Sequence, residues 1–259
     1  MKKKVQVIDL SVPLQNRSME GVVFSPQIVR YTSDETARTW CNQVGLSPKD
    51  LPGETHLNSD AVSLRTHSGT HLDAPLHFGP TCEGRPPKSI DQVPLEWCYG
   101  DGVVLDFTHK KAGEIIGVEE VKAALKKINH RLEKGEIVLI RTDATKHYSE
   151  FDFTAMHPSL GRESLLWILD QGIRVVGIDA HSFDVDGKYM AERFKKDRDP
   201  NVLWPCHYVG REREYLHAEK LANLDQIPRP TDFQVFLFPV KVERATGGWC
   251  RAVAIVPED

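Results

Sequence analysis

The sequence predicts an α/β fold with mixed strands, and two patterns carry this prediction. Segments rich in β-branched residues alternate with segments of helical periodicity over residues 102–179, in the order strand, helix, strand, helix, strand. This order is typical of parallel strands layered with helices. Additional strand-like segments follow between residues 234 and 256, so the predicted sheet extends beyond that run.

The N-terminal part predicts one strand and little other regular structure. Residues 5–12 (VQVIDLSV) are β-rich and alternate loosely, which favours a strand. Residues 18–60 carry scattered Pro, Gly, Ser and Asn with little periodicity, so we expect long irregular connections there. A short helix near Ser33–Val44 is expected to interrupt them.

The central run supplies five elements. Strands are predicted at Gly102–Phe107, Glu136–Arg141 and Ile173–Asp179, and helices at Val118–Ile128 and Gly161–Gln171. In the first helix, apolar residues recur at positions 118, 121, 125 and 128, with Lys and Glu on the opposite face. Gly172 is expected to cap the end of the second helix, and His157-Pro158 to begin that helix.

The C-terminal part completes the predicted sheet. Gln234–Val240 and Arg251–Val256 are predicted strands, joined through Gly247-Gly248. Residues 184–201 are polar and charged and are expected to form a solvated loop. No segment has the composition of an interdomain linker, so residues 1–259 are predicted to form a single domain.

Charge, hydropathy and cysteine usage narrow the class of protein. Lys and Arg number 33 against 37 Asp and Glu, a net charge of -4 that argues against a nucleic-acid binder. The longest apolar stretches have only strand length, so no membrane span is expected. The five cysteines are widely spaced without a C-x-x-C pair, and the N-terminus lacks the apolar core of a signal peptide. We therefore expect a cytoplasmic protein with reduced thiols.

Residues 65–78 (RTHSGTHLDAPLHF) concentrate His67, His71, Asp73 and His77 within one short segment. Imidazole and carboxylate are usual ligands of zinc, manganese and iron. A helix would place Asp73 about 200° round from His71. A strand would separate His67 from His77 by about 33 Å. Neither regular element gathers the four side chains.

The segment must therefore bend, and Gly69 and Pro75 stand where bends are favoured. An irregular loop that gathers two His and one Asp is what a metal site with open positions needs. Chance clustering of histidines on a surface is the competing interpretation. Three His and one Asp around Gly and Pro favour metal binding or catalysis over it.

The run His67–His77 meets every fixed position of the signature H-x-G-T-H-x-D-x-P-x-H and resembles the cyclase family of metal-dependent hydrolases. That family includes bacterial kynurenine formamidase, isatin hydrolase and some lactam hydrolases. Further segments resemble the family's D-L-S strand, its G-[IV]-D-x-x-S-x-D segment, its E-x-L-x-N-L motif and its closing strand, at Asp9–Ser11, Gly177–Asp184, Glu219–Leu224 and Gly247–Ala254. The resemblance spans most of the chain.

The resemblance implies a β/β/α cyclase-like fold around a barrel-like sheet with flanking helices, assembled as a homodimer or homotetramer. It also implies that His67, His71 and Asp73 bind a divalent metal, Zn²⁺ or Mn²⁺. In the family, the equivalent of His77 acts as the acid and base of the reaction.

A second ion is implied by the formamidase branch, in which a later His and a Glu twelve residues beyond it are ligands. His207 and Glu219 stand twelve apart here, and Glu219 opens the matching motif. Asp73 and Glu219 would bridge the two ions. The isatin hydrolase branch holds one manganese on the first three ligands, so one ion and two ions both stay open.

The implied reaction is hydrolysis of a C–N amide bond in a small cyclic or N-acyl aromatic amide by metal-activated water. Lactone hydrolysis, cyclisation and dehydration on the same site are alternatives. A non-catalytic metal-binding protein is another, but structural metal sites are usually closed and often rich in Cys, and no Cys accompanies the motif. No G-x-S-x-G, G-x-G-x-x-G or P-loop sequence is present, so serine hydrolase and nucleotide-binding functions lack support.

The substrate pocket is less defined by the sequence. The chain has extra residues before His67 and between Asp184 and His207 compared with the small formamidases, and these are expected to shape the pocket. Aromatic residues that could line it, although isolated aromatics more often lie in the core, are Phe24, Phe183, Trp204 and Tyr208. His181 follows a predicted strand end and stays a candidate. The other six of the eleven histidines are expected to be incidental: His56, His109, His130, His147, His157 and His217.

Overall fold

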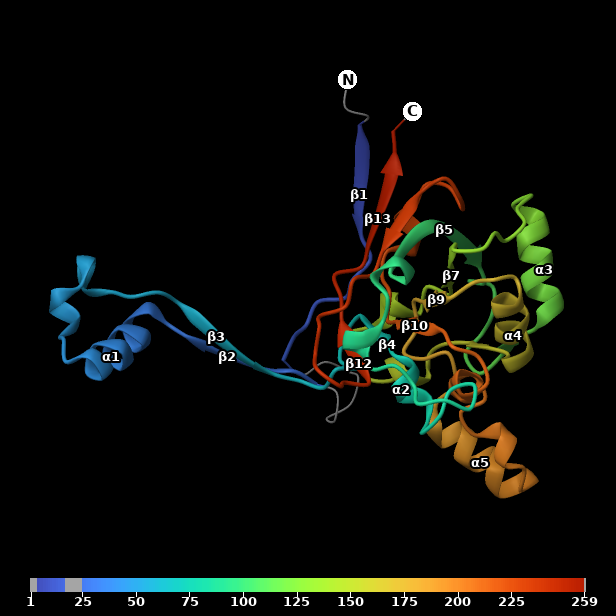
Figure 1. Ribbon diagram of the computed structural model, residues 1–259, viewed down its shortest axis with the longest axis horizontal. Helices are drawn as coiled ribbons and strands as arrows, with labels where there is room; N and C mark the ends of the chain where they lie inside the picture. The colour runs from blue at the N-terminus through green and yellow to red at the C-terminus, as the bar shows by residue number, and fades with distance from the viewer. Residues whose placement is uncertain (1–3, 17–24, 259) are drawn as a thin grey trace.

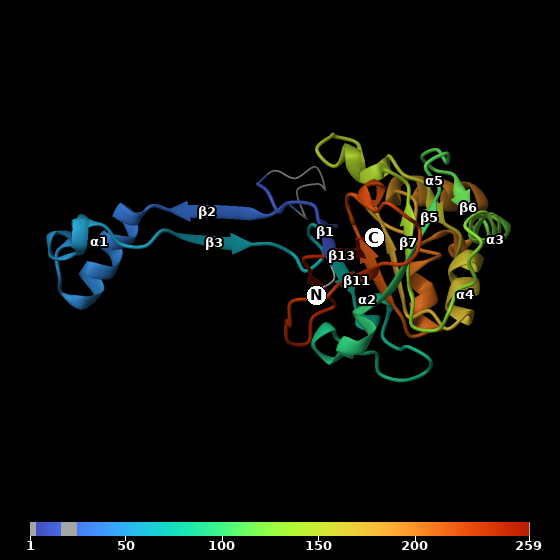
Figure 2. The same cartoon turned by 90° about the horizontal axis from the view of Figure 1, so that it is seen from above.

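The computed structural model describes residues 4–16 and 25–258, and Figure 1 shows that they form two parts. One part, which we call the body, holds a large sheet with helices packed beside it. The other, which we call the arm, comprises residues 27–63 and projects away from the body. Figure 2 shows the same projection from above. None of the helices in the described ranges has the length and apolar character needed to cross a bilayer.

The body is organised around one nine-stranded mixed sheet that curls into a half-barrel. Its strands, in spatial order, are β1 (Val5–Asp9), β13 (Val253–Pro257), β11 (Gln234–Phe236), β5 (Tyr99–Asp106), β7 (Ile137–Arg141), β9 (Val175–Ile178), β10 (Leu216–Glu219), β4 (His71–Asp73) and β12 (Gly247–Trp249). The four strands from β5 to β10 run parallel, and the outer pairs run antiparallel. The predicted α/β fold with mixed strands is confirmed.

Alternating residues of the central strands fill two cores, because successive side chains of a strand point to opposite faces. On β7, Ile137 and Leu139 enter one core, which lies inside the curl of the sheet. Val138 and Ile140 enter the other core, together with the apolar faces of the helices α3 (Val118–Lys127) and α4 (Arg162–Asp170). These two helices make the crossovers between the parallel strands and lie side by side in Figure 1.

Most predicted elements of the central run are confirmed within one to three residues. One boundary is wrong: α4 begins at Arg162, not at His157-Pro158. The residues between them include β8 (Ser159–Leu160), which pairs with β6 (Ile115–Ile116) and takes up the backbone before the helix begins. Gly172 has a φ of 92°, and its N–H bonds to the carbonyl of Leu169, as expected of a glycine that ends a helix.

Two segments that were predicted to lack regular structure have it. Within residues 184–201, Gly187–Asp197 form the helix α5, whose first turn is capped by the Asp186 carboxylate. Its charged residues face solvent and Met190 is buried, so a largely charged sequence still presents one apolar side. Similarly, Gly247-Gly248 is not a simple connection, because both residues belong to β12 and pair with β4.

The arm corrects the expectation of irregular connections over residues 18–60. Of that range, residues 25–60 are described, and they include β2 (Gln27–Tyr31), part of its partner β3 (Ser59–Ser63) and the helix α1 (Ser33–Val44). The predicted helix is thus confirmed with the same boundaries. The two strands were missed because all but one of their residues are exposed, which leaves no alternation of apolar and polar residues to detect.

Candidate metal centre

Strand β4 and the bend before it place the first candidate ligands. His71 and Asp73 stand two residues apart on β4 and therefore share a face of the sheet. The bend is made at Gly69, whose φ is 61° and where an added Cβ would lie 2.7 Å from Cδ2 of Leu14. The hydroxyl of Thr70 fixes the turn, because it donates to the carbonyl of Lys220 at 2.5 Å and accepts from the N–H of Val12 at 2.9 Å.

The Asp73 carboxylate lies between the two histidines of the predicted first set. Its Oδ1 is 2.6 Å from Nδ1 of His67 and 3.1 Å from Nε2 of His71. Nε2 of His67 is 2.8 Å from the hydroxyl of Thr246, which orients that ring. The bend at residues 67–73 thus gathers His67, His71 and Asp73, as the sequence predicted.

His77 stands over this group at the edge of a cavity. It lies on the short helix α2 (Pro75–Phe78), which begins with Pro75 in its first turn. Its Nε2 is 3.8 Å from Oδ2 of Asp73, and its ring centroid is 4.1 Å from that of His67. Burial lowers the pKa of His77 to about 4, against the attraction of the Asp73 carboxylate. The ring is therefore neutral near pH 7 and can accept a proton.

A second group of donors faces the other oxygen of Asp73. Nε2 of His207 is 3.8 Å from Oδ2 of Asp73 and 3.9 Å from Oε1 of Glu219. Oε2 of Glu219 is 3.7 Å from Nε2 of His71. Asp73 and Glu219 therefore each direct one oxygen toward His71 and the other oxygen toward His207. The structure brings His207 and Glu219 beside the motif, as the sequence predicted.

His217 also belongs to this group, so the expectation that it is incidental was wrong. It is completely buried on β10, and its Nδ1 is 3.8 Å from both Oδ2 of Asp73 and Oε1 of Glu219. The sequence carried one signal for it: a position two residues before Glu219 shares that residue's face of a strand. Without the knowledge that residues 216–219 form a strand, that signal had no meaning.

The donor atoms fit a divalent cation. Asp73, His207, His217 and Glu219 offer one atom each within 4.8 Å of one another, and so do His67, Asp73 and His77. Four buried atoms in or beside these groups have no hydrogen-bond partner among the described residues: Nε2 of His71, Oδ2 of Asp73, Nδ1 of His217 and Oε1 of Glu219. His71 itself belongs to neither group, but its Nε2 is 3.1 Å from Oδ1 of Asp73. Buried polar atoms without partners are costly, and bound cations would give them partners.

The electrostatic environment of Asp73 and Glu219 also favours a bound cation. Burial opposes ionisation of Asp73, but His77, His71 and His67 outweigh it and hold the pKa of Asp73 well below its usual range. Burial, followed by the nearby Asp73 charge, raises the pKa of Glu219. Two carboxylates this close and this buried are stabilised when a cation lies between them.

Hydrogen bonds on the far side of the rings fix which nitrogen faces the centre. Nδ1 of His71 donates to the carbonyl of Gly69 at 2.8 Å, and Nδ1 of His207 donates to Oδ2 of Asp184 at 2.6 Å. Both rings therefore direct Nε2 to the centre, in the arrangement common to metal-binding histidines.

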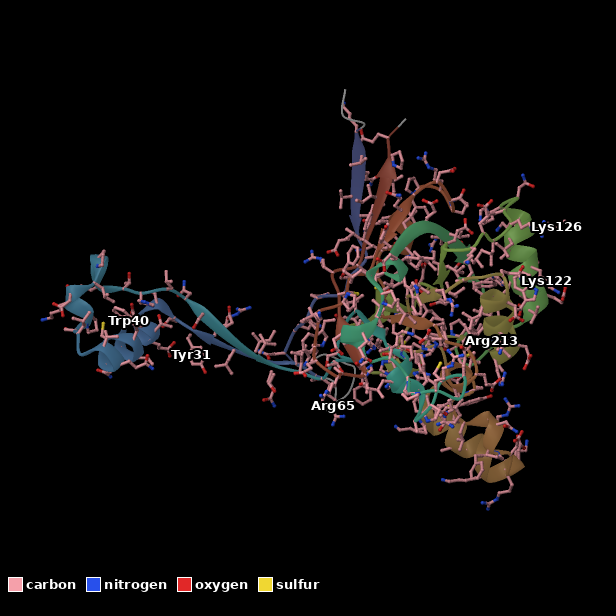
Figure 3. All side chains as sticks on the ribbon, in the orientation of Figure 1. Tyr31, Trp40, Arg65, Lys122, Lys126 and Arg213 are labelled. Atoms are coloured by element: carbon pink, nitrogen blue, oxygen red, sulfur yellow. The ribbon has the colours of Figure 1, made fainter. Side chains whose placement is uncertain are left out.

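A cavity of about 260 Å³ opens onto the group. His77 and His181 line it, together with Arg65 at the root of the arm, and Asp186 and Trp204 come from the segment between Asp184 and His207. Figure 3 shows Arg65 where the arm meets the body. Both extra segments thus reach the cavity wall, as expected.

The other aromatic candidates divide between core and surface. Phe183 is buried and stacks on His217. Tyr208 is 37% exposed. Phe24 lies outside the described residues. A larger hollow of about 590 Å³, between α3 and residues 224–230, contains His109 but none of the clustered donors, so its size does not make it the site.

Comparisons with known proteins place the chain among related sequences and folds. A family profile described as "Putative cyclase" matches residues 8–185. Kynurenine formamidase of Paracidovorax citrulli is 27% identical over 222 residues, which cover 85% of this chain and 87% of that protein. A kynurenine formamidase of Bacillus cereus is 29% identical over 198 residues, covering 76% and 79%. The structure of isatin hydrolase A from Ralstonia solanacearum aligns with a TM-score of 0.76 at 22% identity, over 97% of this chain and 92% of that one.

Proposed function

The chain belongs to the cyclase family, and from that premise we propose that it is a metal-dependent hydrolase of small amides. The bond cleaved is the C–N bond of a cyclic or N-acyl aromatic amide, and the products are a carboxylate and a free nitrogen. The observation that carries the proposal is the convergence of four buried donor atoms without hydrogen-bond partners among the described residues, beside a cavity. The names of the relatives, formamidase and isatin hydrolase, supply the two amide classes.

His67, His71 and Asp73 would hold the ion that takes part in the reaction. A divalent ion bound there supplies Lewis acidity to the substrate carbonyl and lowers the pKa of water from about 15.7 towards 7. Zn²⁺ and Mn²⁺ both suit two imidazoles and a carboxylate. His207 and Glu219 would hold a second ion, with Asp73 and Glu219 shared between the two positions.

His77 is the proposed acid and base. Its ring lies against His67 and borders the cavity, so its Nε2 can reach a water molecule and a substrate in that space. Because its pKa lies below neutrality, it accepts the proton of the attacking water. It then delivers this proton to the nitrogen as the C–N bond breaks, which returns the ring to its neutral form.

The cavity and its lining favour a small, flat substrate. Its volume of about 260 Å³ lies below the range of about 300–1,000 Å³ usual for drug-sized ligands. The indole of Trp204, 41% exposed at the cavity wall, offers a face for an aromatic ring. We further propose that residues 1–259 act as one domain, in the cytoplasm, on a small-molecule substrate.

The test is an activity screen of one preparation with and without metal. The protein is stripped with a chelator and reloaded separately with Zn²⁺ and Mn²⁺, and each form is assayed on N-formyl anilines, isatins, small lactams and lactones. Hydrolysis of an amide by a reloaded form, and none by the stripped form, supports the proposal. Metal-dependent hydrolysis of lactones alone contradicts it in favour of the alternative reaction on this site. A fully loaded protein that turns over none of these compounds contradicts the proposal as well.

A further inference from the structure

The orientation of the His217 ring is set by its neighbours. Its Nε2 bonds to the Tyr215 hydroxyl, and that hydroxyl in turn donates to the carbonyl of Cys206 at 3.1 Å. Since the phenolic proton is used on Cys206, the hydroxyl accepts from His217, whose Nε2 therefore carries the hydrogen. Phe183 stacks on the ring at 4.1 Å between centroids and keeps it in plane. Nδ1 is left unprotonated and is directed at the centre.

Four donor atoms around the second metal position lie within 4.8 Å of one another, and four of the six distances between them are nearly equal. Nε2 of His207 and Nδ1 of His217 are each 3.8 Å from Oδ2 of Asp73. Their distances to Oε1 of Glu219 are 3.9 and 3.8 Å. Metal–ligand bonds of about 2.1 Å imply edges of about 3.4 Å in a tetrahedral site, so a contraction of a few tenths of an ångström would seat an ion.

We propose that His217 is a fourth protein ligand, which closes the shell of the second ion as Asp73, His207, His217 and Glu219. This inference rests on the proposed function and deepens it. A closed tetrahedral shell of two imidazoles and two carboxylates suits Zn²⁺ and leaves no position for water or substrate. The two positions then divide the work: the ion at His67, His71 and Asp73 keeps open positions for the reaction, and the ion at His217 holds β4 to β10 and fixes the shared carboxylates.

Zinc stoichiometry and affinity of the full chain test this assignment. The wild type, His217→Leu, Tyr215→Phe and the matched control His130→Leu are loaded with Zn²⁺ alone, dialysed and analysed by mass spectrometry of the metal. Affinity is measured by competition with a chromophoric chelator. His130 pairs with Glu136 away from the centre, so its variant makes the same chemical change outside the cluster.

The expected result is two ions per chain in the wild type and His130→Leu, and one in His217→Leu. Tyr215→Phe removes the hydroxyl that orients the ring, together with its hydrogen bond to the carbonyl of Cys206, so it should bind the second ion about 10- to 100-fold more weakly. Cobalt loading gives a second readout, because the intense visible absorption of a tetrahedral ion should be lost with His217. If circular dichroism shows that His217→Leu does not fold, Tyr215→Phe decides.

The assignment is overturned if Tyr215→Phe keeps the zinc affinity of the wild type and any folded His217→Leu retains two ions. It is also overturned if the wild type takes up at most one ion. These results are distinct from failure of the proposed function. A chain that binds two ions, loses one with His217 and hydrolyses no amide would keep this inference and contradict the activity.

Discussion

The body and the arm are stabilised by different means. In the body, alternating side chains of the central strands enter two cores, and every proposed ligand is fixed by contacts with at least one other strand or loop. In the arm, order comes from local features: strand pairing over five residues and a helix with a capping box and a glycine C-cap. The proposed chemistry of this chain therefore depends on long-range contacts of the body, whereas the structure of the arm depends on contacts between residues close in the sequence.

The largest expected effect is a loss of metal and activity in the body that leaves the arm unchanged. Asp73→Asn removes the oxygen charge shared by both groups of ligands, so we expect ion content to fall below one per chain and activity to fall to that of the chelated protein. The arm should not respond, and the rate at which a thiol reagent modifies Cys41, which is buried on α1, should stay that of the wild type. A variant that keeps both ions and its activity would contradict the shared role of Asp73.

The next effect lies within the body and separates binding from catalysis. His77→Ala should retain its metal and lose about 10²- to 10⁴-fold in kcat, the usual contribution of a general acid and base. Metal analysis and steady-state kinetics measure the two quantities on one sample. The exposed His147 pairs with Glu150, and His147→Ala should change neither. Retained turnover in His77→Ala would remove it from the mechanism.

A smaller effect tests how rigidly the body holds the motif. Gly69→Ala combines a left-handed backbone with a Cβ 2.7 Å from Leu14, so we expect a loss of about 1–3 kcal/mol in the free energy of unfolding. Gly113 has a φ of +79° with open space around it, so Gly113→Ala should cost less and isolates the backbone contribution. Equal losses in denaturant unfolding of the two variants would show that the close approach to Leu14 is unimportant.

The smallest effect is confined to the arm. Thr32 caps α1 by accepting from the N–H of Glu35, and its own N–H is bonded by the Glu35 carboxylate at 2.8 Å. Thr32→Ala should weaken this end by about 1 kcal/mol and raise the rate of Cys41 modification severalfold, with metal content and activity unchanged. Thr39→Ala, inside the same helix, is the matched control and should not raise it. A fall in the stability of the whole body would show that the two parts are coupled.

Residue spacing and periodicity were sufficient to predict the chemistry of the motif and the order of the central elements. The run from His67 to His77 required a bend because of its residue spacing, and Gly69 supplies that bend with a φ of 61°. The helical and strand periodicities of residues 102–179 record which side each residue buries, so they could be recognised without the tertiary structure.

The position of His217 beside the other donors and the two strands of the arm could not be predicted without the tertiary structure. His217 reaches the centre because β10 pairs with β4 antiparallel, which sets His217 opposite Asp73 across the sheet, and no local pattern encodes that register. The strands of the arm carry almost no burial pattern within one chain, so periodicity could not reveal them. Long-range pairing sets both features, and a linear sequence records such pairing only through the residues that it buries.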